Sequence, residues 1–510
     1  MDTTSSGRDR KSLRIGIIGA GFAGIGLAAR LLQAGYSNIV IFERAPSLGG
    51  TWRDNTYPGA ACDVPSHLYS FSFAPKSDWH NRYARQYEIH SYMQDLASRF
   101  GVEPLLRCGR SVEQAVFNDV DGTWLVTTSR AERETFDVLV TAVGQLSVPS
   151  VPKFAGLERF DRPTFHSAAW DHSVPLAGKR IAVVGSAASA TQIVPELAKV
   201  ASRVIVYQRT PNWIIPRWDR PYGAIDRALC RYVPLYRKMV RACIYLRQEA
   251  LFQALRTGSA LNRTMQRVSR WHIRRQVRDA ILRDKLTPRY TFGCKRVLLS
   301  DDYLPSFNLP TVELVTERIA GFEPGAIRTM DGTCRPCDAV VFATGFDTRN
   351  TLSGIDIRGC DGARLSDCWS HGPAAYLGVA VPKFPNFFLL YGPNTNLGHN
   401  SILFMFECQF DFIMQCLDRL VARGVMALEV SAEACASYNR DLQAKLAGSV
   451  WVTGCGNWYG DGERITANWP GSTIRYRYET RHVNFHHFVE HRFGSDAIAA
   501  RSLSELTQTR

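Results

Sequence analysis

Two glycine-rich segments about 166 residues apart constrain the fold of this chain more than any other feature. In the first, an apolar run that begins at Ile15 leads into the pattern GxGxxG, formed by Gly19, Gly21 and Gly24. Gly19 permits a tight turn, Gly21 lets the backbone approach a pyrophosphate, and Gly24 lets a helix pack closely on a strand. The next apolar run ends at Glu43, whose carboxylate can accept hydrogen bonds from both ribose hydroxyls. This order predicts a strand-helix-strand unit that binds a dinucleotide; a coincidental glycine-rich turn is the alternative.

The second glycine-rich segment follows the same order with two substitutions. It begins at Gly185, and Ala187 and Ala190 replace the second and third glycines, which a close approach tolerates because a methyl group is small. The apolar run after it is followed by Arg209. An acid there would repel a 2′-phosphate, whereas an arginine can pair with one. We therefore interpret the first site as one for FAD and the second as one for NADPH, with a solvated surface arginine as the alternative for Arg209.

Length and composition agree with a large globular protein. A chain of 510 residues is too long for a single ordinary hydrophobic core, and a hydrophobic content of 45% is typical of a globular chain. No apolar run reaches the ~18 residues that span a bilayer, and residues 1–12 do not form a secretory signal. The thirteen cysteines have no framework spacing, so we expect reduced thiols and a cytoplasmic location. Cys334 and Cys337 form a CxxC pair that we interpret as structural, and we expect no metal site.

The net charge of +14 is concentrated between residues 227 and 289. Apolar residues recur there at helical spacing, as at Leu246, Leu251 and Leu255, which predicts a helical subdomain over about 223–289. Three explanations of the charge stay open: solvated helix faces, a field that attracts NADPH, or a patch that contacts a membrane surface or nucleic acid. We expect the first, with no nucleic-acid partner and no stable membrane insertion.

A segment just before the second glycine-rich unit carries residues by which a family can be recognised. Phe160, His166, Trp170 and Asp171 match the fingerprint FxGxxxHxxxW followed by Pro or Asp. The chain thus resembles the type I Baeyer-Villiger monooxygenases of the flavin-containing monooxygenase superfamily, whose amine-oxidising members have another residue where Trp170 stands. Arg162 occupies the glycine position, where a bulky residue can alter the local backbone. Two interpretations of His166 remain: a part of the hinge between the domains, or a histidine that only organises the linker.

The resemblance covers about residues 13–480, and it implies a set of binding residues. The tail is most similar to the 4-hydroxyacetophenone monooxygenase branch. On this resemblance the FAD site comprises Gly19, Gly21, Phe22, Ala23, Gly24, Glu43, Gly50, Thr51, Trp52, Tyr57, Asp63 and Tyr69. The NADP site comprises Gln145, Gly185, Ser186, Ala187, Ser189, Ala190, Arg209, Lys295, Arg296, Thr344 and Gly345. The substrate pocket is expected to include Asn396 and Trp458.

The resemblance implies an NADPH-dependent flavoprotein monooxygenase that inserts one oxygen atom of O2 into a ketone through a flavin C4a-peroxide, with NADP+ retained during turnover. Arg296 is expected to be the catalytic cation, and Asp63 the catalytic carboxylate that holds it beside the flavin. Three alternatives remain: a purely structural Asp63–Arg296 pair, oxidation of sulfur or nitrogen, and a flavin oxidoreductase without oxygenation. A disulfide reductase would need a cysteine pair near the flavin, and the segment after Glu43 holds only Cys62. The expected substrate is a small hydrophobic ketone, and the expected assembly is a monomer or a homodimer.

The expected fold class is α/β, with two doubly wound Rossmann-like dinucleotide-binding domains and a helical subdomain. We expect the NADP domain, residues 148–347, to be inserted in the FAD domain, whose two parts are residues 9–147 and 348–510. Ligands bind at the carboxyl ends of parallel strands, so the substrate pocket should lie between the domains.

Overall fold

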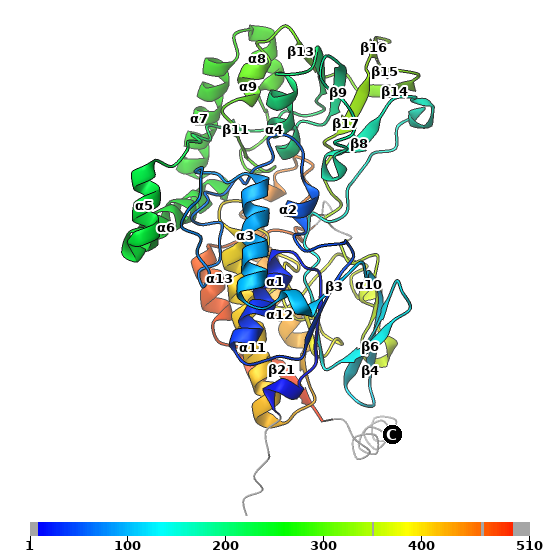
Figure 1. Cartoon of the computed structure of the whole chain (residues 1–510), viewed down its shortest axis with the longest axis vertical. Coiled ribbons are helices and arrows are strands. Elements are labelled where there is room, and N and C mark those ends of the chain that lie inside the picture. Colours follow the sequence, from blue (N-terminus) through cyan, green and yellow to red (C-terminus); the bar gives the residue numbers. More distant parts are fainter. Residues whose placement is uncertain (1–8, 349–350, 461–463, 493–510) are drawn as a thin grey trace, which may run out of the picture.

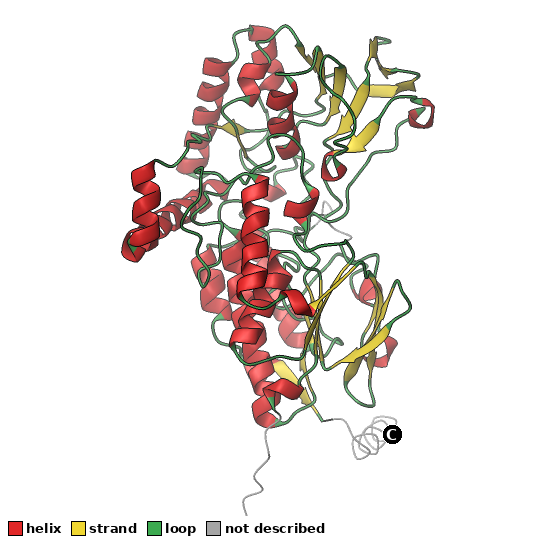
Figure 2. Cartoon of the chain, in the orientation of Figure 1, coloured by secondary structure: helices red, strands yellow, loops and turns green. Residues whose placement is uncertain are grey.

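The computed structural model describes residues 9–348, 351–460 and 464–492; the end of the expected segment 348–510 lies outside the described residues. Two parallel β-sheets follow one another along the long axis of the molecule, and most of the long helices lie on one side of them (Figures 1 and 2). The first sheet has the strand order β19-β7-β1-β2-β3. Its strands are β1 (Ile15–Ile18), β2 (Ile39–Glu43), β3 (Leu106–Cys108), β7 (Val138–Thr141) and β19 (Phe387–Leu389).

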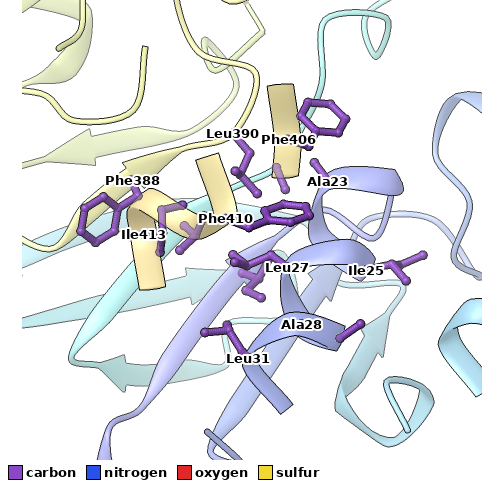
Figure 3. Packing of buried hydrophobic residues seen from close by; sticks show 14 of the residues in the cluster. Ala23, Ile25, Leu27, Ala28, Leu31, Phe388, Leu390, Phe406, Phe410 and Ile413 are labelled. Carbon is purple, nitrogen blue, oxygen red and sulfur yellow. The ribbon is translucent and has the colours of Figure 1, made fainter. Parts of the chain in front are cut away.

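Alternate residues of these strands pack on opposite faces of the first sheet, as the period of two in a strand requires. On one face Ile17 and Ile41 pack against α1 (Phe22–Gln33), α3 (Gln86–Arg99) and α11 (Ile402–Arg423). Figure 3 shows Phe410 of α11 beside Leu27 of α1. The close packing of α1 is possible because Gly26 has no side chain; a Cβ there would lie 2.4 Å from the ring of Phe71.

On the other face the first sheet is covered by a second, four-stranded sheet. Its order is β18-β4-β5-β6, with β4 (Val112–Asn118), β5 (Thr123–Thr128), β6 (Arg133–Phe136) and β18 (Asp356–Arg358). Ile18 and Phe42 of the parallel strands share a buried cluster with Trp124 of β5. The first sheet is therefore buried on both faces, which explains its nearly continuous apolar strands.

The other parallel sheet has the order β13-β10-β9-β17-β8. Its strands are β8 (Thr164–His166), β9 (Arg180–Val184), β10 (Arg203–Tyr207), β13 (Val312–Val315) and β17 (Ala339–Phe342). The helices α4 (Ala188–Leu197) and α9 (Tyr303–Ser306) pack on it, and β14 (Ile319–Glu323), β15 (Ala326–Thr329) and β16 (Cys334–Pro336) form an antiparallel sheet at one side. The two parallel sheets with their helices confirm the predicted fold class.

All strands of this sheet come from the chain between β7 and β19, so the chain leaves the first sheet once and returns once. The outgoing and returning segments lie side by side: Pro149 and Phe346 form an antiparallel bridge. The amide of Ser150 donates to the carbonyl of Gly345 at 2.9 Å, and the amide of Asp347 donates to that of Val148 at 2.8 Å. The connection between the two sheets is thus a short two-stranded crossing.

The basic region forms four helices, α5 (Ala224–Tyr232), α6 (Pro234–Leu251), α7 (Ala260–Gln276) and α8 (Ala280–Leu286). In Figure 1, α5 and α6 stand out at one side of the molecule. The apolar repeat of the region does not all face inward, because Leu255 is buried whereas Leu246 is 61% exposed. The inward face of α6 carries Arg241, whose guanidinium donates to the carbonyls of His67 and Ser70, both at 2.9 Å.

The C-terminal part of the chain packs beside the first sheet. Its elements are α10 (Leu365–Cys368), β20 (Ala427–Val430), α12 (Ala432–Leu446), α13 (Thr473–Thr480) and β21 (Phe488–His491). The remaining elements are α2 (Thr51–Asp54) and the short parallel pair β11 (Ile214–Ile215) and β12 (Leu298–Leu299). Eight short 3-10 helices complete the described chain, among them η5 (Phe252–Leu255) and η7 (Val450–Val452). No helix in the described ranges has both the length and the apolar content needed to span a bilayer.

The expectation that all cysteines are reduced is wrong for one pair. Cys294 and Cys455 form a disulfide, with Cα atoms 6.3 Å apart and 161 residues between them in sequence. Sequence spacing could not reveal this pair because tertiary packing alone brings the two residues together. Cys334 and Cys337 are both free thiols, and the described residues hold no cluster of side chains suited to a metal ion.

Candidate functional site

The turn between β1 and α1 has the geometry of a phosphate cradle. Gly19 has φ +110°, and a Cβ there would lie 2.6 Å from the carbonyl oxygen of Ala142. A Cβ on Gly24 would lie 1.9 Å from the carbonyl oxygen of Gly19, so the helix packs on the turn only without a side chain. Above Gly21, by contrast, the space is open to 4 Å. The first amides of α1 therefore face an open space that fits a pyrophosphate.

Glu43 lies at the carboxyl end of β2 and shapes this turn. Its two carboxylate oxygens accept hydrogen bonds from the amides of Ala20 and Ala45, each at 2.9 Å. Arg53 lies 3.3 Å from the same carboxylate. A carboxylate oxygen can accept more than one hydrogen bond, so the geometry remains compatible with a ribose.

Several other expected FAD residues lie around this turn, whereas Tyr57 packs against the core of the second parallel sheet and its hydroxyl donates to Gln192 of α4 at 3.0 Å. A Cβ on Gly50, at the start of α2, would lie 3.2 Å from the Cα of Gly21. Trp52 donates to the hydroxyl of Tyr69 at 3.1 Å, and Tyr69 packs edge-on against Phe22. The structure therefore brings the two halves of the expected FAD site together.

The turn between β9 and α4 repeats the first one. Gly185 has φ +111°, and a Cβ there would lie 2.4 Å from the carbonyl oxygen of Ala343. Ala187 precedes the helix with φ −86° and ψ −159°, close to the −82° and −169° of Gly21. Because this backbone is extended, alanine fits at the second glycine position without strain.

Two cations lie together at the carboxyl end of β10. Burial, followed by the charge of Arg209, lowers the pKa of Lys295. Arg209 is exposed, whereas Lys295 is partly buried and lies over the ring of Tyr290. Two adjacent positive charges of this kind suit a phosphate group. At the crossing, Oε1 of the buried Gln145 has no hydrogen-bond partner in the described chain, which also fits a bound cofactor.

Asp63 and Arg296 form an ion pair between the two parts of the molecule. Nε and Nη2 of Arg296 donate to Oδ2 of Asp63 at 3.0 and 2.5 Å. Their side chains are 33% and 36% exposed, so both remain open to a ligand. Burial acts to raise the pKa of Asp63, but the charge and hydrogen bonds of Arg296 outweigh it and lower that pKa. The charge of Asp63 in turn raises the pKa of Arg296.

Three residues near this pair, Gln192, Arg217 and Tyr391, belong to no motif in the sequence, and a fourth, Tyr459, lies in the tail that resembles the family. Gln192 of α4 donates to the carbonyl of Ala61 at 2.9 Å, and Arg217 donates to that of Cys62 at 3.0 Å. Both side chains hold the segment that carries Asp63 from the side of the second parallel sheet. Tyr391 and Tyr459 lie near Arg296, and burial raises the pKa of both hydroxyls, so they stay neutral at pH 7.

A pocket opens beside the crossing, at the carboxyl ends of β7 and β19. Its lining includes Val143, Gln145, Leu390, Tyr391, Pro393 and Trp458. Asn396 lies behind the lining, where it accepts a hydrogen bond from the hydroxyl of Tyr391 at 2.7 Å. Tyr391 has φ +64°, an uncommon backbone conformation for a bulky residue. Of the two expected pocket residues, Trp458 therefore lines the pocket and Asn396 supports it.

The fingerprint segment belongs to the edge of the second parallel sheet. Phe160 and Trp170 are buried, and His166 is the last residue of β8. The carboxylate of Asp171 accepts a hydrogen bond from the amide of Ser173 at 2.9 Å. The ring of His166 lies 5.7 Å from that of Phe346 in the returning crossing.

Arg162, at the glycine position of the fingerprint, is exposed and lies 3.6 Å from Asp161. It is not among the residues with positive φ. Arginine at this position therefore leaves the backbone in an ordinary conformation.

The chain is similar to proteins of known family over nearly its whole length. A family model described as FMO-like, flavin-binding monooxygenase-like, matches residues 12–351. A Baeyer-Villiger monooxygenase of Streptomyces coelicolor is 40% identical over 475 residues, which are 92% of this chain and 91% of the relative. The crystal structure of OTEMO in complex with FAD and NADP has a TM-score of 0.86 at 28% identity, and that of cyclohexanone monooxygenase from Rhodococcus sp. Phi1 bound to NADP+ has 0.86 at 27%. Each alignment covers 94% of this chain and 99% of the other.

Proposed function

The chain belongs to the flavin-binding monooxygenase-like family, and from this membership we propose which of its residues carry out a Baeyer-Villiger oxidation. It is an FAD- and NADPH-dependent monooxygenase that inserts one atom of O2 into a ketone to give an ester or a lactone. The resemblance seen in the sequence is confirmed for the Baeyer-Villiger enzymes as a group. Closer kinship of the tail with the 4-hydroxyacetophenone branch stays a prediction.

The two turns are assigned to the two cofactors. Gly19, Gly21 and Glu43 would hold FAD, and the turn at Gly185 with Arg209 and Lys295 would hold NADPH. When bound and reduced by hydride from NADPH, FAD supplies the electrons that activate O2. Residues 148–347 are accordingly proposed as the NADP domain, with its boundaries in the two crossings.

Arg296 is proposed to stabilise the negative charge that develops on the ketone oxygen when the carbonyl carbon is attacked. Its guanidinium remains charged throughout, because the carboxylate of Asp63 raises its already high pKa. Asp63 fixes the direction of the guanidinium through two hydrogen bonds, which leaves the other N–H groups free to donate to a ligand. A cation positioned before the reaction needs no reorganisation when the charge appears. The observation that carries this proposal is the partly exposed Asp63–Arg296 pair, which the chain builds from both sides of the crossing.

The substrate is proposed to be a small hydrophobic ketone. Apolar side chains, including Val143, Leu390 and Trp458, make up much of the pocket lining, and they would exclude water from the reacting atoms. We further propose that the enzyme works in the cytoplasm as a monomer or a homodimer. Size-exclusion chromatography with light scattering tests the assembly.

Replacement of Arg296 by alanine tests the catalytic assignment. Arg296→Ala is expected to accept hydride from NADPH near the parental rate, because Arg209 and Lys295 remain, but to form ester ~10²- to 10³-fold more slowly. Anaerobic stopped-flow reduction measures the first step, and gas chromatography of the products from a ketone panel measures the second. Arg289→Ala, which removes an exposed arginine paired only with Asp284, is the matched control. Parental ester formation by Arg296→Ala would contradict the assignment, and a parent that oxidises only sulfides or amines would contradict the ketone substrate.

A further inference from the structure

The disulfide between Cys294 and Cys455 joins the inserted part of the chain to the part that follows the crossing. Cys294 directly precedes Lys295 and Arg296. Cys455 lies three residues before Trp458, which lines the pocket. The bond therefore connects the segment that supplies the expected phosphate-binding lysine and the catalytic arginine to the wall of the pocket.

Close packing around the disulfide extends this connection. Gly293 has φ +82°, and a Cβ there would lie 2.9 Å from Leu255 and 3.3 Å from Val450. The side-chain amide of Asn457 lies 3.7 Å from the sulfur of Cys294 and 3.6 Å from that of Cys455. Asn457 also donates to the carbonyl of Trp451 at 2.8 Å and accepts from the amide of Tyr459 at 3.0 Å. One side chain thus links both sulfurs to Tyr459.

The two cysteine residues differ in exposure to solvent. Cys294 is fully buried, whereas Cys455 is partly exposed between Gly454 and Gly456. Both glycines are exposed and have positive φ values of 78° and 62°. We therefore expect a small thiol to react at Cys455, and the fully buried Cys294 to react only through its partner.

We infer that Cys294 and Cys455 form a reversible thiol-disulfide site whose oxidised form positions Lys295 and Arg296 for NADPH binding and oxygen transfer. The part that concerns Arg296 rests on the function proposed above. In the dithiol form, only non-covalent contacts hold residues 292–296 on the loop around Cys455. The segment then occupies more conformations, and NADPH binding must restrict them at a cost in affinity.

The electron balance of both directions is simple. In reduction, a dithiol such as dithiothreitol attacks the sulfur of Cys455, the S–S bond breaks and the thiolate of Cys294 leaves; the second thiol of the reagent then releases Cys455 and forms a cyclic disulfide. In oxidation, two thiols and one hydrogen peroxide give one disulfide and two water molecules. Peroxide is available to this enzyme, because oxidation of NADPH by O2 without substrate oxygenation yields NADP+ and hydrogen peroxide.

The test compares NADP+ affinity between the two forms of the FAD-loaded enzyme. Peptide mapping after alkylation, without reduction, should find Cys294 joined to Cys455 after peroxide treatment and both alkylated after dithiothreitol. Isothermal titration should then show NADP+ binding about tenfold weaker in the reduced form. Because linkage is reciprocal, saturating NADP+ should raise the ratio of reduced to oxidised dithiothreitol that half-reduces the disulfide by the same factor of about ten.

Serine variants separate the disulfide from other thiols. Cys294→Ser and Cys455→Ser should bind NADP+ as weakly as the reduced parent and should no longer respond to dithiothreitol. Cys334→Ser, which removes an exposed free thiol of β16, should behave as the parent in both forms. If Cys294→Ser fails to fold, the NADP+ affinities of the reduced parent and of Cys455→Ser, which is changed in a solvent-facing loop, still test the inference.

Two results would overturn the inference: equal NADP+ affinity of oxidised and reduced parent, or free thiols at both positions after peroxide treatment. A protein that shows the affinity shifts but converts no ketone supports the redox site and contradicts the proposed function instead. Hydrogen peroxide released per NADPH, measured with a converted ketone, should increase several-fold on reduction, because Arg296 is then less well positioned.

Discussion

Single residues in this protein show how position within the fold decides the role of a charge. Arg203 and Arg209 lie at opposite ends of β10. Arg203 pairs with Glu313 at 2.7 Å, whereas Arg209 lies near Lys295 at the carboxyl end, where parallel sheets bind their ligands. The same residue type thus serves a surface ion pair at one end and is proposed to bind phosphate at the other.

Arg209→Ala is expected to reduce the preference of the enzyme for NADPH over NADH. Loss of one charge-assisted hydrogen bond to phosphate costs roughly 1.5–3 kcal/mol, which corresponds to about ten- to a hundredfold in the ratio of kcat/KM values. Steady-state oxidation of both cofactors measures this ratio. Arg203→Ala is the control at the other end of the strand and should keep the parental preference for NADPH over NADH. If Arg209→Ala also keeps the parental ratio of kcat/KM values, residues other than Arg209 bind the 2′-phosphate.

At the scale of elements, local patterns predicted the two glycine-rich turns and missed the features that long-range contacts determine. Both turns follow from short motifs, since Gly19 and Gly185 impose the same left-handed turn. The periodicity around Leu246 predicted a helix but not its orientation. α6 turns Arg241 inward because the carbonyls at His67 and Ser70 accept its hydrogen bonds, and these residues lie more than 170 positions away. The disulfide escaped prediction for the same reason.

Glu249 of α6 illustrates the energetic weight of such long-range contacts. Its carboxylate accepts hydrogen bonds from Asn400 at 2.6 Å and from the amide and hydroxyl of Thr473 at 3.1 and 2.6 Å. Burial acts to raise the pKa of Glu249, but the adjacent His399, whose Nε2 lies 3.5 Å away, and the hydrogen bonds from Thr473 and Asn400 lower it to about 2. The contribution of this group to stability is therefore complete above the ordinary glutamate pKa and is lost as the pH falls toward about 2.

Glu249→Gln is expected to destabilise the protein by about 2 kcal/mol at pH 7, because the amide accepts at one atom only and loses the charge. The loss relative to the parent should shrink as the pH is lowered. Thermal unfolding of the FAD-loaded enzyme between pH 7 and pH 3 measures both effects. Glu479→Gln, which removes a surface pair with Arg475, should change the unfolding temperature little. A pH-independent difference between Glu249→Gln and the parent would show that the carboxylate is not the stabilising group.

For the whole molecule, the main consequence of the fold is that the site is assembled from both sides of one crossing. Asp63 comes from the first part of the chain, Arg296 from the inserted part and Trp458 from the part after it. Motifs predicted the presence of these residues, but only the three-dimensional arrangement added Gln192 and Arg217, which hold the Asp63 segment from the opposite side. Any rotation of one sheet against the other must therefore change the site.

His166→Ala tests whether the fingerprint segment controls such a rotation. The ring of His166 packs against Phe346 of the crossing, and burial lowers its pKa, so it is a neutral contact at pH 7. Its removal is expected to raise the hydrogen peroxide released per NADPH about tenfold while FAD remains bound, because a loosened crossing misplaces catalytic groups. Peroxidase-coupled assays with a converted ketone measure this release. His371→Ala, which removes an exposed histidine beside Ser370, is the control. If His166→Ala releases no more hydrogen peroxide per NADPH than the parent, the fingerprint segment is only a linker.

Because Pro149 and Phe346 pair at the crossing, the chain enters and leaves the inserted part, here called the cassette, at neighbouring positions. Its first and last residues are hydrogen-bonded neighbours, so a short turn is enough to close either the cassette or the remainder of the chain after excision. New termini could be opened elsewhere on the surface for the same reason. Exchange of the inserted part, which is proposed to bind NADPH, needs cuts at a single place in space, and the replacement must also supply the partner of Cys455 and the contacts of Gln192 and Arg217 with the first part.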